Sequence, residues 1–135
     1  MPPTIQDEAD NSEKAPLTVA VIDIGATSIR MAVAEIRADG SIRMLETLSQ
    51  AVCLGKDSFF NGLIERKTIE DCVQVLKVYR SKLREYGILS RSQIRVVATS
   101  AVNEASNRLA FQDRVYIATG MEVEPIDESA PFADS

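Results

Sequence analysis

The nine residues from Leu17 to Gly25, LTVAVIDIG, constrain the fold more than any other feature of the sequence. Aliphatic side chains fill this stretch almost without interruption, which is typical of a β-strand covered on both faces. The strand ends in Asp23, Ile24 and Gly25, followed by small and hydroxyl residues at positions 26–28. A carboxylate at this point indicates either a simple turn or a loop that binds phosphate. The remainder of the chain decides between these two interpretations.

Composition limits the type of core and of partner. A chain of 135 residues suits one domain, and with 45% hydrophobic but only 5% aromatic residues its core must be mainly aliphatic. The net charge is −5 and no stretch concentrates Lys or Arg, which argues against nucleic acid as a partner. No apolar run approaches the roughly 18 residues of a membrane span.

Two residue types restrict the chemistry and the compartment. The sequence has no histidine, which excludes a histidine base, a His-ligated zinc and a Ser-His-Asp triad. Its two cysteines have no metal-type spacing, and the acidic start is unlike a signal peptide. We therefore expect a cytoplasmic protein without a membrane partner, and leave a homodimer open. The cysteines and the tyrosines are interpreted as packing residues: Cys53, Cys72, Tyr79, Tyr86 and Tyr116.

The pattern of apolar residues predicts an α/β fold. Residues 1–16 are acidic and poor in apolar residues, so we expect a disordered tail; residues 17–127 form the domain, and 128–135 an irregular tail. Strands are expected at 17–25, 29–37, 41–52, 94–101 and 121–127, with a tight turn at Asp39-Gly40 and a loop after residue 52. Helices are expected from Thr68, as the capping residue, to Gly87 and from 102 to 117. Pro125 favours an edge position for the last strand.

These elements predict a mixed five-stranded sheet with flanking helices. Three strands with short links form an antiparallel meander, and each helical crossover returns a parallel strand. Two loops then follow parallel neighbours, DIGATS at 23–28 and ATSAVNEASN at 98–107. Ligands bind at such strand ends in open α/β sheets.

Both loops have the composition of a phosphate site. Gly25 and Ala26 let a ligand approach the backbone, and Thr27 and Ser28 add hydroxyls beside free N–H groups. Asp23 could hold Mg²⁺ or orient a water molecule. Thr99 and Ser100 stand at the expected start of a helix, where phosphate binds to unpaired N–H groups. Glu104 and Asn107 either anchor that helix or are solvated.

Four segments resemble the N-terminal domain of the exopolyphosphatase and guanosine pentaphosphate phosphatase (Ppx/GppA) family. They are AVIDIGATSIRMAVAE, AVCLGKDSFFNGLIERKTIEDCVQVL, IRVVATSAVNEASN and FQDRVYIATGMEVEPID. The resemblance implies an actin-like ATPase (ribonuclease H-like) domain that removes terminal phosphate from polyphosphate or guanosine pentaphosphate with Mg²⁺. Because phosphoryl transfer depends on positioning and charge neutralisation, loops rich in backbone N–H groups suit it.

The resemblance also assigns roles to single residues. It implies one phosphate clamp from Gly25, Ala26, Thr27 and Ser28, with a second group beside it: Thr99, Ser100, Ala101 and Asn103. Asp23 becomes a catalytic residue and the metal ligand. Glu128 is the carboxylate nearest to the position of the family's catalytic glutamate. From the resemblance we also expect that the family's second domain is absent, so that the chain is a fragment or truncated form of a two-domain enzyme.

Three departures keep other functions open. The family usually has Ser-Asn where this chain has Ala26-Thr27, and arginine where it has Cys53 and Asn103. One alternative is therefore a non-catalytic module that binds phosphate or nucleotide. Another is a kinase of the same superfold, because DIGATS suits the phosphates of ATP equally well and fold alone does not separate the two.

Overall fold

The computed structural model describes residues 16–126. Its elements are β1 (Leu17–Ile24), β2 (Ser28–Ile36), β3 (Ile42–Ala51), α2 (Leu54–Asn61), α3 (Arg66–Glu85), the 3₁₀ turn η1 (Arg91–Gln93), β4 (Ile94–Ala98), α4 (Ser100–Asn103), α5 (Arg108–Thr119) and β5 (Val123–Pro125). Among these described elements, no helix combines the length and the apolar character needed to cross a membrane.

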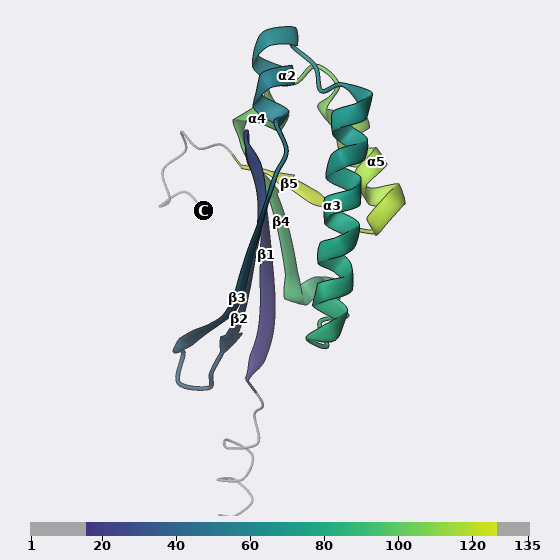
Figure 1. The fold of residues 1–135 in the computed structure, drawn as a ribbon. Helices are drawn as coiled ribbons and strands as arrows, with labels where there is room; N and C mark the ends of the chain where they lie inside the picture. Colours follow the sequence, from purple (N-terminus) through teal and green to yellow (C-terminus); the bar gives the residue numbers. More distant parts are fainter. Residues whose placement is uncertain (1–15, 127–135) are drawn as a thin grey trace, which may run out of the picture.

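The strands form the predicted mixed sheet, in the order β3-β2-β1-β4-β5. β1, β2 and β3 make an antiparallel meander, while β1 pairs in parallel with β4, and β4 with β5 (Figure 1). The turn between β2 and β3 uses Gly40 at φ +87°, with the Ser41 N–H donating to the Asp39 carboxylate at 2.8 Å. β5 is an edge strand, as the proline predicted.

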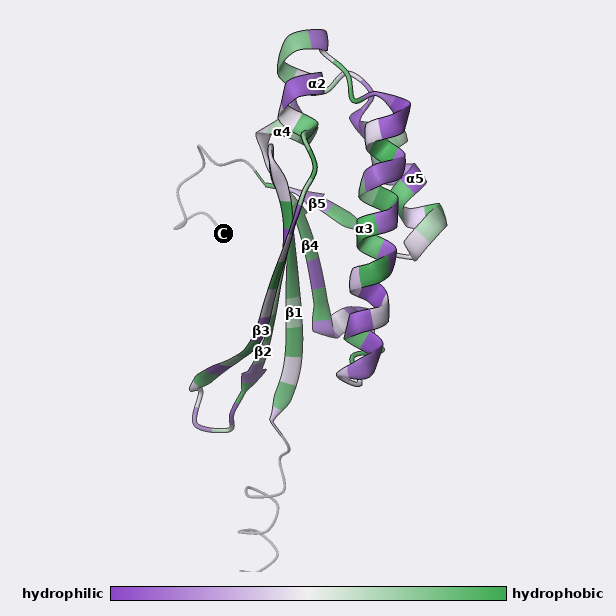
Figure 2. Cartoon of the chain, viewed as in Figure 1, coloured by the Kyte–Doolittle hydropathy of each residue, from purple (hydrophilic) through white to green (hydrophobic). Residues whose placement is uncertain are grey.

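One face of the sheet carries the core. Ile22 and Ile24 of β1 are fully buried, and α3 packs on this face through residues at helical spacing. Figure 2 shows α3 with polar and apolar residues alternating along its length. The expectation that β1 is covered on both faces is wrong for the described residues. Val21, which points to the other face, is 44% exposed, because α3 and α5 lie on the same side (Figure 1).

The residues interpreted as packing residues divide into two groups. Cys72 and Tyr79 are buried, and the Tyr79 hydroxyl donates to the Ile29 carbonyl at 2.7 Å. Burial raises the pKa of the Cys72 thiol to about 12, so this thiol stays protonated. Tyr86 is half-buried. The interpretation is wrong for Cys53, which is exposed, and for Tyr116, which is 46% exposed.

The helices differ from the prediction in three places. The expected loop after residue 52 contains α2. α3 begins two residues before Thr68, and the Asp57 carboxylate accepts the Glu65 N–H at 3.0 Å just ahead of it. The single helix expected at 102–117 is interrupted, giving α4 and α5.

Candidate functional site

The carboxyl ends of β1 and β4 lie next to each other at one edge of the sheet. Ile24 is opposite Ala98 in the parallel pair, and the Thr99 N–H donates to the Ile24 carbonyl at 3.4 Å. The prediction that the two loops follow parallel neighbouring strands is therefore confirmed. Figure 1 shows α2 and α4 at this same end of the sheet.

The first loop is a compact turn. The Gly25 N–H donates to the Ser28 carbonyl at 2.9 Å, and a Cβ on Gly25 would lie 3.3 Å from that oxygen. Within residues 16–126, the N–H groups of Ala26 and Thr27 have no recorded acceptor. Thr27 is exposed, whereas Gly25, Ala26 and Ser28 are half-buried. The loop thus offers donors and a hydroxyl to an anion without bulky side chains.

Helix α2 holds this loop from outside. The Gly55 N–H donates to the Ala26 carbonyl at 2.8 Å, and the Val52 N–H donates to the Thr27 carbonyl at 3.1 Å. A Cβ on Gly55 would lie only 2.8 Å from the Ala26 Cβ. Because two consecutive carbonyls of the loop are used in this way, its conformation is fixed by the segment 52–55.

The second loop leads into a helix of a single turn. Thr99 precedes α4 without a side-chain capping bond, and its carbonyl accepts the N–H groups of Val102 and Asn103 at 3.0 and 3.1 Å. Ala101 is completely buried, so it lies behind the surface that a ligand would contact. The expectation of a long helix starting here is wrong, because α4 ends at Asn103. The N–H group of Ser100, rather than a long helix dipole, is therefore the donor that this loop offers.

Asn103 joins α4 to the end of β5. Its Nδ2 donates to the Ile126 carbonyl at 2.8 Å, and the Ile126 N–H donates to the Ala98 carbonyl at 2.8 Å. The Asn103 Oδ1 is buried and lacks a partner among the described residues. The side chain is neutral and one of its polar atoms is already engaged, so any contact with phosphate must use what remains of the amide.

Asp23 lies one residue before the end of β1, on the face opposite the helices. Its neighbours across the sheet are Arg30 on β2 and Val97 on β4. Within the described part of the chain, Asp23 forms no ion pair with Arg30, and its Oδ1 is buried without a hydrogen-bond partner. A shielded carboxylate oxygen without a donor is costly, which is the condition that a bound cation or water relieves.

The donor set fits a hard cation only in part. Carboxylate oxygen is the ligand type that Mg²⁺ prefers, and Mg²⁺ commonly binds to one or two carboxylates together with phosphate oxygens and water. In residues 16–126 no three His, Cys, Asp or Glu residues are grouped as metal ligands. Asp23 would therefore hold Mg²⁺ together with oxygens of a bound ligand. Glu128 lies outside the described residues.

Two contributors to this edge were not predicted. Gly55 and Val52 contact the first loop through their backbones, and the sequence of α2 has no regular apolar spacing that would reveal it.

Asn107 is an anchor, as one of the two interpretations allowed: its amide accepts the Ile64 N–H at 2.9 Å and donates to the Ile64 carbonyl at 2.8 Å. Glu104 is exposed.

Solved structures similar to this chain carry the same architecture. A Ppx/GppA family member from Aquifex aeolicus superposes with a TM-score of 0.77 and is 32% identical, over 84% of this chain and 36% of its own. An exopolyphosphatase from Cytophaga hutchinsonii superposes with a TM-score of 0.74 and is 28% identical, over 82% of this chain and 34% of its own. The chain therefore spans about a third of these proteins.

Sequence comparison leads to the same group. A bifunctional 3-dehydroquinate synthase/phosphatase from Fusobacterium nucleatum is 31% identical over 108 residues, which are 77% of this chain and 16% of the relative. The sequence pattern of the Ppx/GppA phosphatase family matches residues 32–130. The actin-like fold expected from the resemblance agrees with these solved structures. On this evidence the chain belongs to the Ppx/GppA phosphatase family.

Proposed function

We propose that this chain takes part in the hydrolysis of terminal phosphate from inorganic polyphosphate or guanosine pentaphosphate. Its contribution is the wall that binds phosphate and Mg²⁺, formed by residues 23–28 and 99–103. The observation that carries the proposal is that, among residues 16–126, the Asp23 Oδ1 has no hydrogen-bond partner and lies beside two loops with N–H groups that have no acceptor. Membership of the Ppx/GppA phosphatase family supports the reaction class.

The chain's own residues supply binding and orientation. The N–H groups of the two loops hold the anionic oxygens of a terminal phosphate, and the hydroxyls of Thr27, Ser28 and Thr99 add further donors. Bound Mg²⁺ would neutralise charge on the phosphate oxygens. Asp23 would hold that ion or orient the attacking water. Glu128 remains the proposed base.

Binding and hydrolysis are measured separately, because the chain spans about a third of the solved relatives. Calorimetry with guanosine pentaphosphate, a short polyphosphate and ATP, each with and without Mg²⁺, tests the wall. Release of inorganic phosphate from the same ligands tests hydrolysis. We expect Mg²⁺-dependent binding of the first two ligands, and weaker binding of ATP.

The decisive variant is Asp23→Asn, with Asp39→Asn as the matched control in the turn at the far end of the meander. Asp23→Asn should weaken Mg²⁺-dependent binding by about tenfold or more, the equivalent of ~1.4 kcal/mol, because a neutral amide replaces the charged ligand. Asp39→Asn should bind as the wild type does. Equal binding by the wild type and Asp23→Asn would show that the wall is placed wrongly.

A second candidate function is binding without catalysis. It is favoured by Asn103, whose neutral amide is engaged by the Ile126 carbonyl at a position where the family usually has arginine. In this case calorimetry gives the same Mg²⁺-dependent binding, but no phosphate is released. Asn103→Arg would then be expected to tighten phosphate binding, since it adds a charged donor at this edge.

A further inference from the structure

A cavity of about 430 Å³ lies at the other end of β4 from the candidate site. It is open to solvent on one side and is lined by the C-terminal half of α3, the residues that follow it, the first half of β4 and the turn between α5 and β5. β5 reaches only as far as Val96 along β4, which leaves the edge of β4 open beside Ile94. The volume is within the range of roughly 300–1,000 Å³ that is typical of small-molecule sites.

Two polar bridges hold the walls of this cavity together. Arg80 on α3 donates through Nη1 to the Thr119 carbonyl at the end of α5, at 3.0 Å. Arg91 pairs with Glu122 on the α5–β5 turn and stands over the Tyr116 ring, 5.7 Å from its centre. Both bridges join segments that are distant in sequence, so the walls of the cavity are linked by contacts within the chain itself.

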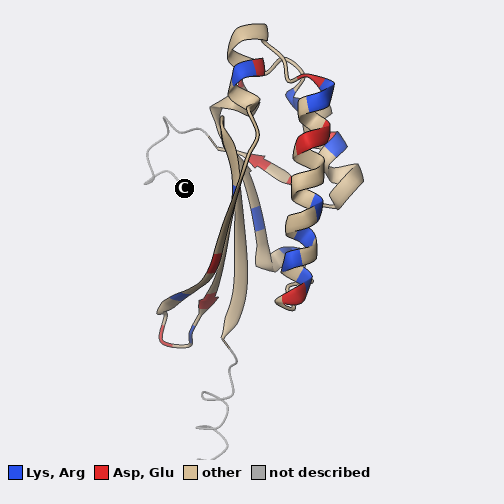
Figure 3. Cartoon of the chain, viewed as in Figure 1, with Lys and Arg blue, Asp and Glu red and all other residues tan. Residues whose placement is uncertain are grey.

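The side chains that line the cavity carry more positive than negative charge. Its carboxylates, Glu122 and Glu124, are each paired with an arginine, Arg91 and Arg95 respectively. Arg84 also lines the cavity and makes no ion pair with any described residue, and the shielded Nε of Arg80 has no partner there. Figure 3 shows several Lys and Arg residues on the C-terminal half of α3. Among the described residues, two guanidinium groups thus have no carboxylate partner, although the net charge of the chain is −5.

Most of the remaining lining is apolar. Ile88, Val96 and Met121 are buried residues that border the cavity, and Leu89 is 77% exposed at its rim. A ligand that fits both halves needs an anionic group for the arginines and an apolar body for these side chains. A bare anion would leave the apolar wall uncovered, and a neutral apolar molecule would leave the arginines unpaired.

We propose that this cavity binds a small amphiphilic anion, a carboxylate or phosphate ester joined to an apolar body. The anionic group lies against Arg84, where the nearby Arg80 guanidinium adds positive charge, and the body covers Ile88, Val96 and Met121. The site is separate from the edge formed by the two loops, and the proposal does not depend on the function proposed for that edge.

The test is a titration of the whole chain followed by methyl NMR, with four probes. Phenyl phosphate and benzoate combine an anion with an apolar body, benzyl alcohol supplies the body alone, and inorganic phosphate supplies the anion alone. We expect phenyl phosphate or benzoate to shift the signals of Ile88, Val96 and Met121. Whichever of these two probes binds more tightly shows whether the cavity prefers a phosphate ester or a carboxylate. Benzyl alcohol and inorganic phosphate should leave these signals unchanged at the same concentrations.

Methyl signals distinguish this cavity from the candidate site. Ile88, Val96 and Met121 report binding in the cavity, whereas Ile24 and Val102 report binding at the candidate site. Shifts confined to that end, or equal binding of benzyl alcohol, would overturn the proposal. Arg84→Gln should weaken the binding of the stronger probe by about tenfold, because it removes a charge-assisted hydrogen bond. The control Arg43→Gln, an exposed arginine on β3 at the opposite edge of the sheet, should not change it. Equal affinities of Arg84→Gln and the wild type would also refute the proposal.

Discussion

Gly55 shows how a single missing side chain can determine the shape of a loop. Its Cα lies against Ala26, so that an added Cβ would approach the Ala26 Cβ to 2.8 Å. Gly55→Ala should therefore lower the free energy of unfolding by about 1–3 kcal/mol, the usual cost of overpacking. Without this clash, alanine would be expected to stabilise a helix relative to glycine. Urea unfolding measures the change.

The double variant Ala26→Gly/Gly55→Ala is the control for this prediction. It removes one of the two colliding carbons, so it should recover much of the stability that Gly55→Ala loses. The amide resonances of Gly25 and Thr27 should shift in Gly55→Ala and return towards their original positions in the double variant. If the two substitutions were simply additive, the proposed contact would not control the loop.

Asn107 joins the start of α5 to the segment before α3. Both hydrogen bonds of its amide are made to the backbone of Ile64, at 2.9 and 2.8 Å. Asn107→Ala should lower the free energy of unfolding by about 2 kcal/mol, since each bond contributes ~1 kcal/mol. The exposed Asn61→Ala serves as the control. Equal urea midpoints for the two variants would contradict the role given to Asn107.

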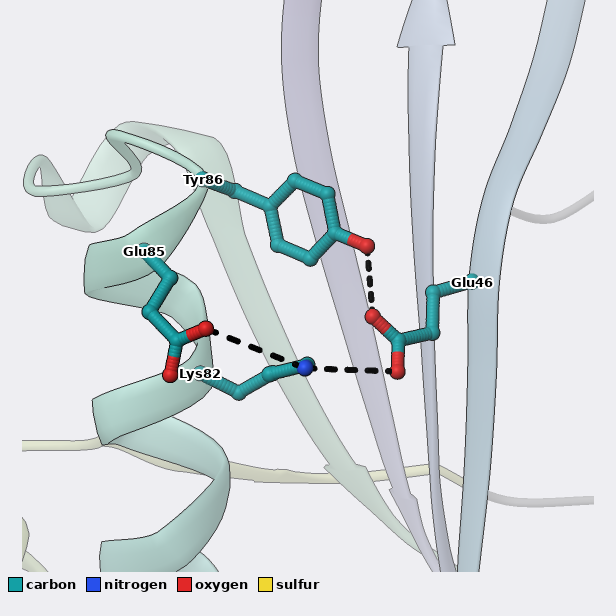
Figure 4. Close-up of polar contacts among 4 residues, drawn as sticks. All are labelled: Glu46, Lys82, Glu85 and Tyr86. Carbon is teal, nitrogen blue, oxygen red and sulfur yellow. Dashed lines mark hydrogen bonds and ion pairs between the residues drawn. The ribbon is translucent and has the colours of Figure 1, made fainter.

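At the scale of elements, a polar cluster attaches the edge strand β3 to the end of α3. The Tyr86 hydroxyl donates to the Glu46 carboxylate, and Lys82 pairs with Glu46 and Glu85 (Figure 4). The hydrogen bond to Glu46 raises the pKa of Tyr86 above its ordinary value of 10.0. The protonated hydroxyl is therefore the form that stabilises the folded chain.

The pH dependence of this contact follows from the direction of the shift. A raised pKa means that the stabilisation is fully present below pH 10 and is lost as the pH rises through the folded pKa. Tyr86→Phe should lower the urea midpoint at pH 7, and its deficit relative to the wild type should shrink above pH 10. Tyr116→Phe, which removes an exposed hydroxyl that makes no hydrogen bond with a described residue, should show neither effect. A deficit that stays constant with pH would refute the assignment.

The elements that could be predicted from sequence are those whose burial follows a local pattern. β1 and β4 appear as aliphatic runs, and the Asp39-Gly40 turn appears from residue type. The parallel pairing of β1 and β4, which brings Asp23 close to Thr99, follows from the order of strands and helices along the chain. The side of the sheet left uncovered could not be predicted, because it depends on where both helices lie.

The missed elements depend on contacts that residue type does not encode. α2 contacts the first loop through the backbone N–H of Gly55, a hydrogen bond that any residue except proline can make. The gap between α4 and α5 is maintained by Asn107 and by the Ser106 N–H, which donates to the Gly62 carbonyl at 2.8 Å. The first feature forms only when Gly55 meets Ala26, about 30 positions earlier in the chain, and the second only when Asn107 meets Ile64, more than forty positions earlier.

At the scale of the whole molecule, β1 is the central strand of the sheet and contributes buried side chains to the core. It is paired with β2 along its full length and with β4 over its second half, and it supplies Ile22 and Ile24 to the core. β5, in contrast, is three residues long and pairs on one side only. The candidate site combines both extremes, since Asp23 belongs to β1 while Asn103 is held by the residue that follows β5.

Hydrogen exchange should therefore divide the candidate site into a stable and a less stable half. Amides of Ile22 and Ile24 should exchange only through global unfolding, because freeing them requires the core to open. Amides of Val123 and Ile126 should exchange through smaller local openings, and Asn103→Ala should speed the exchange of Ile126 further while leaving Ile22 unchanged. Equal opening free energies for β1 and β5 would contradict this division. If the difference is observed, the position of Asp23 is set by the fold, whereas the position of α4 can still adjust when a ligand binds.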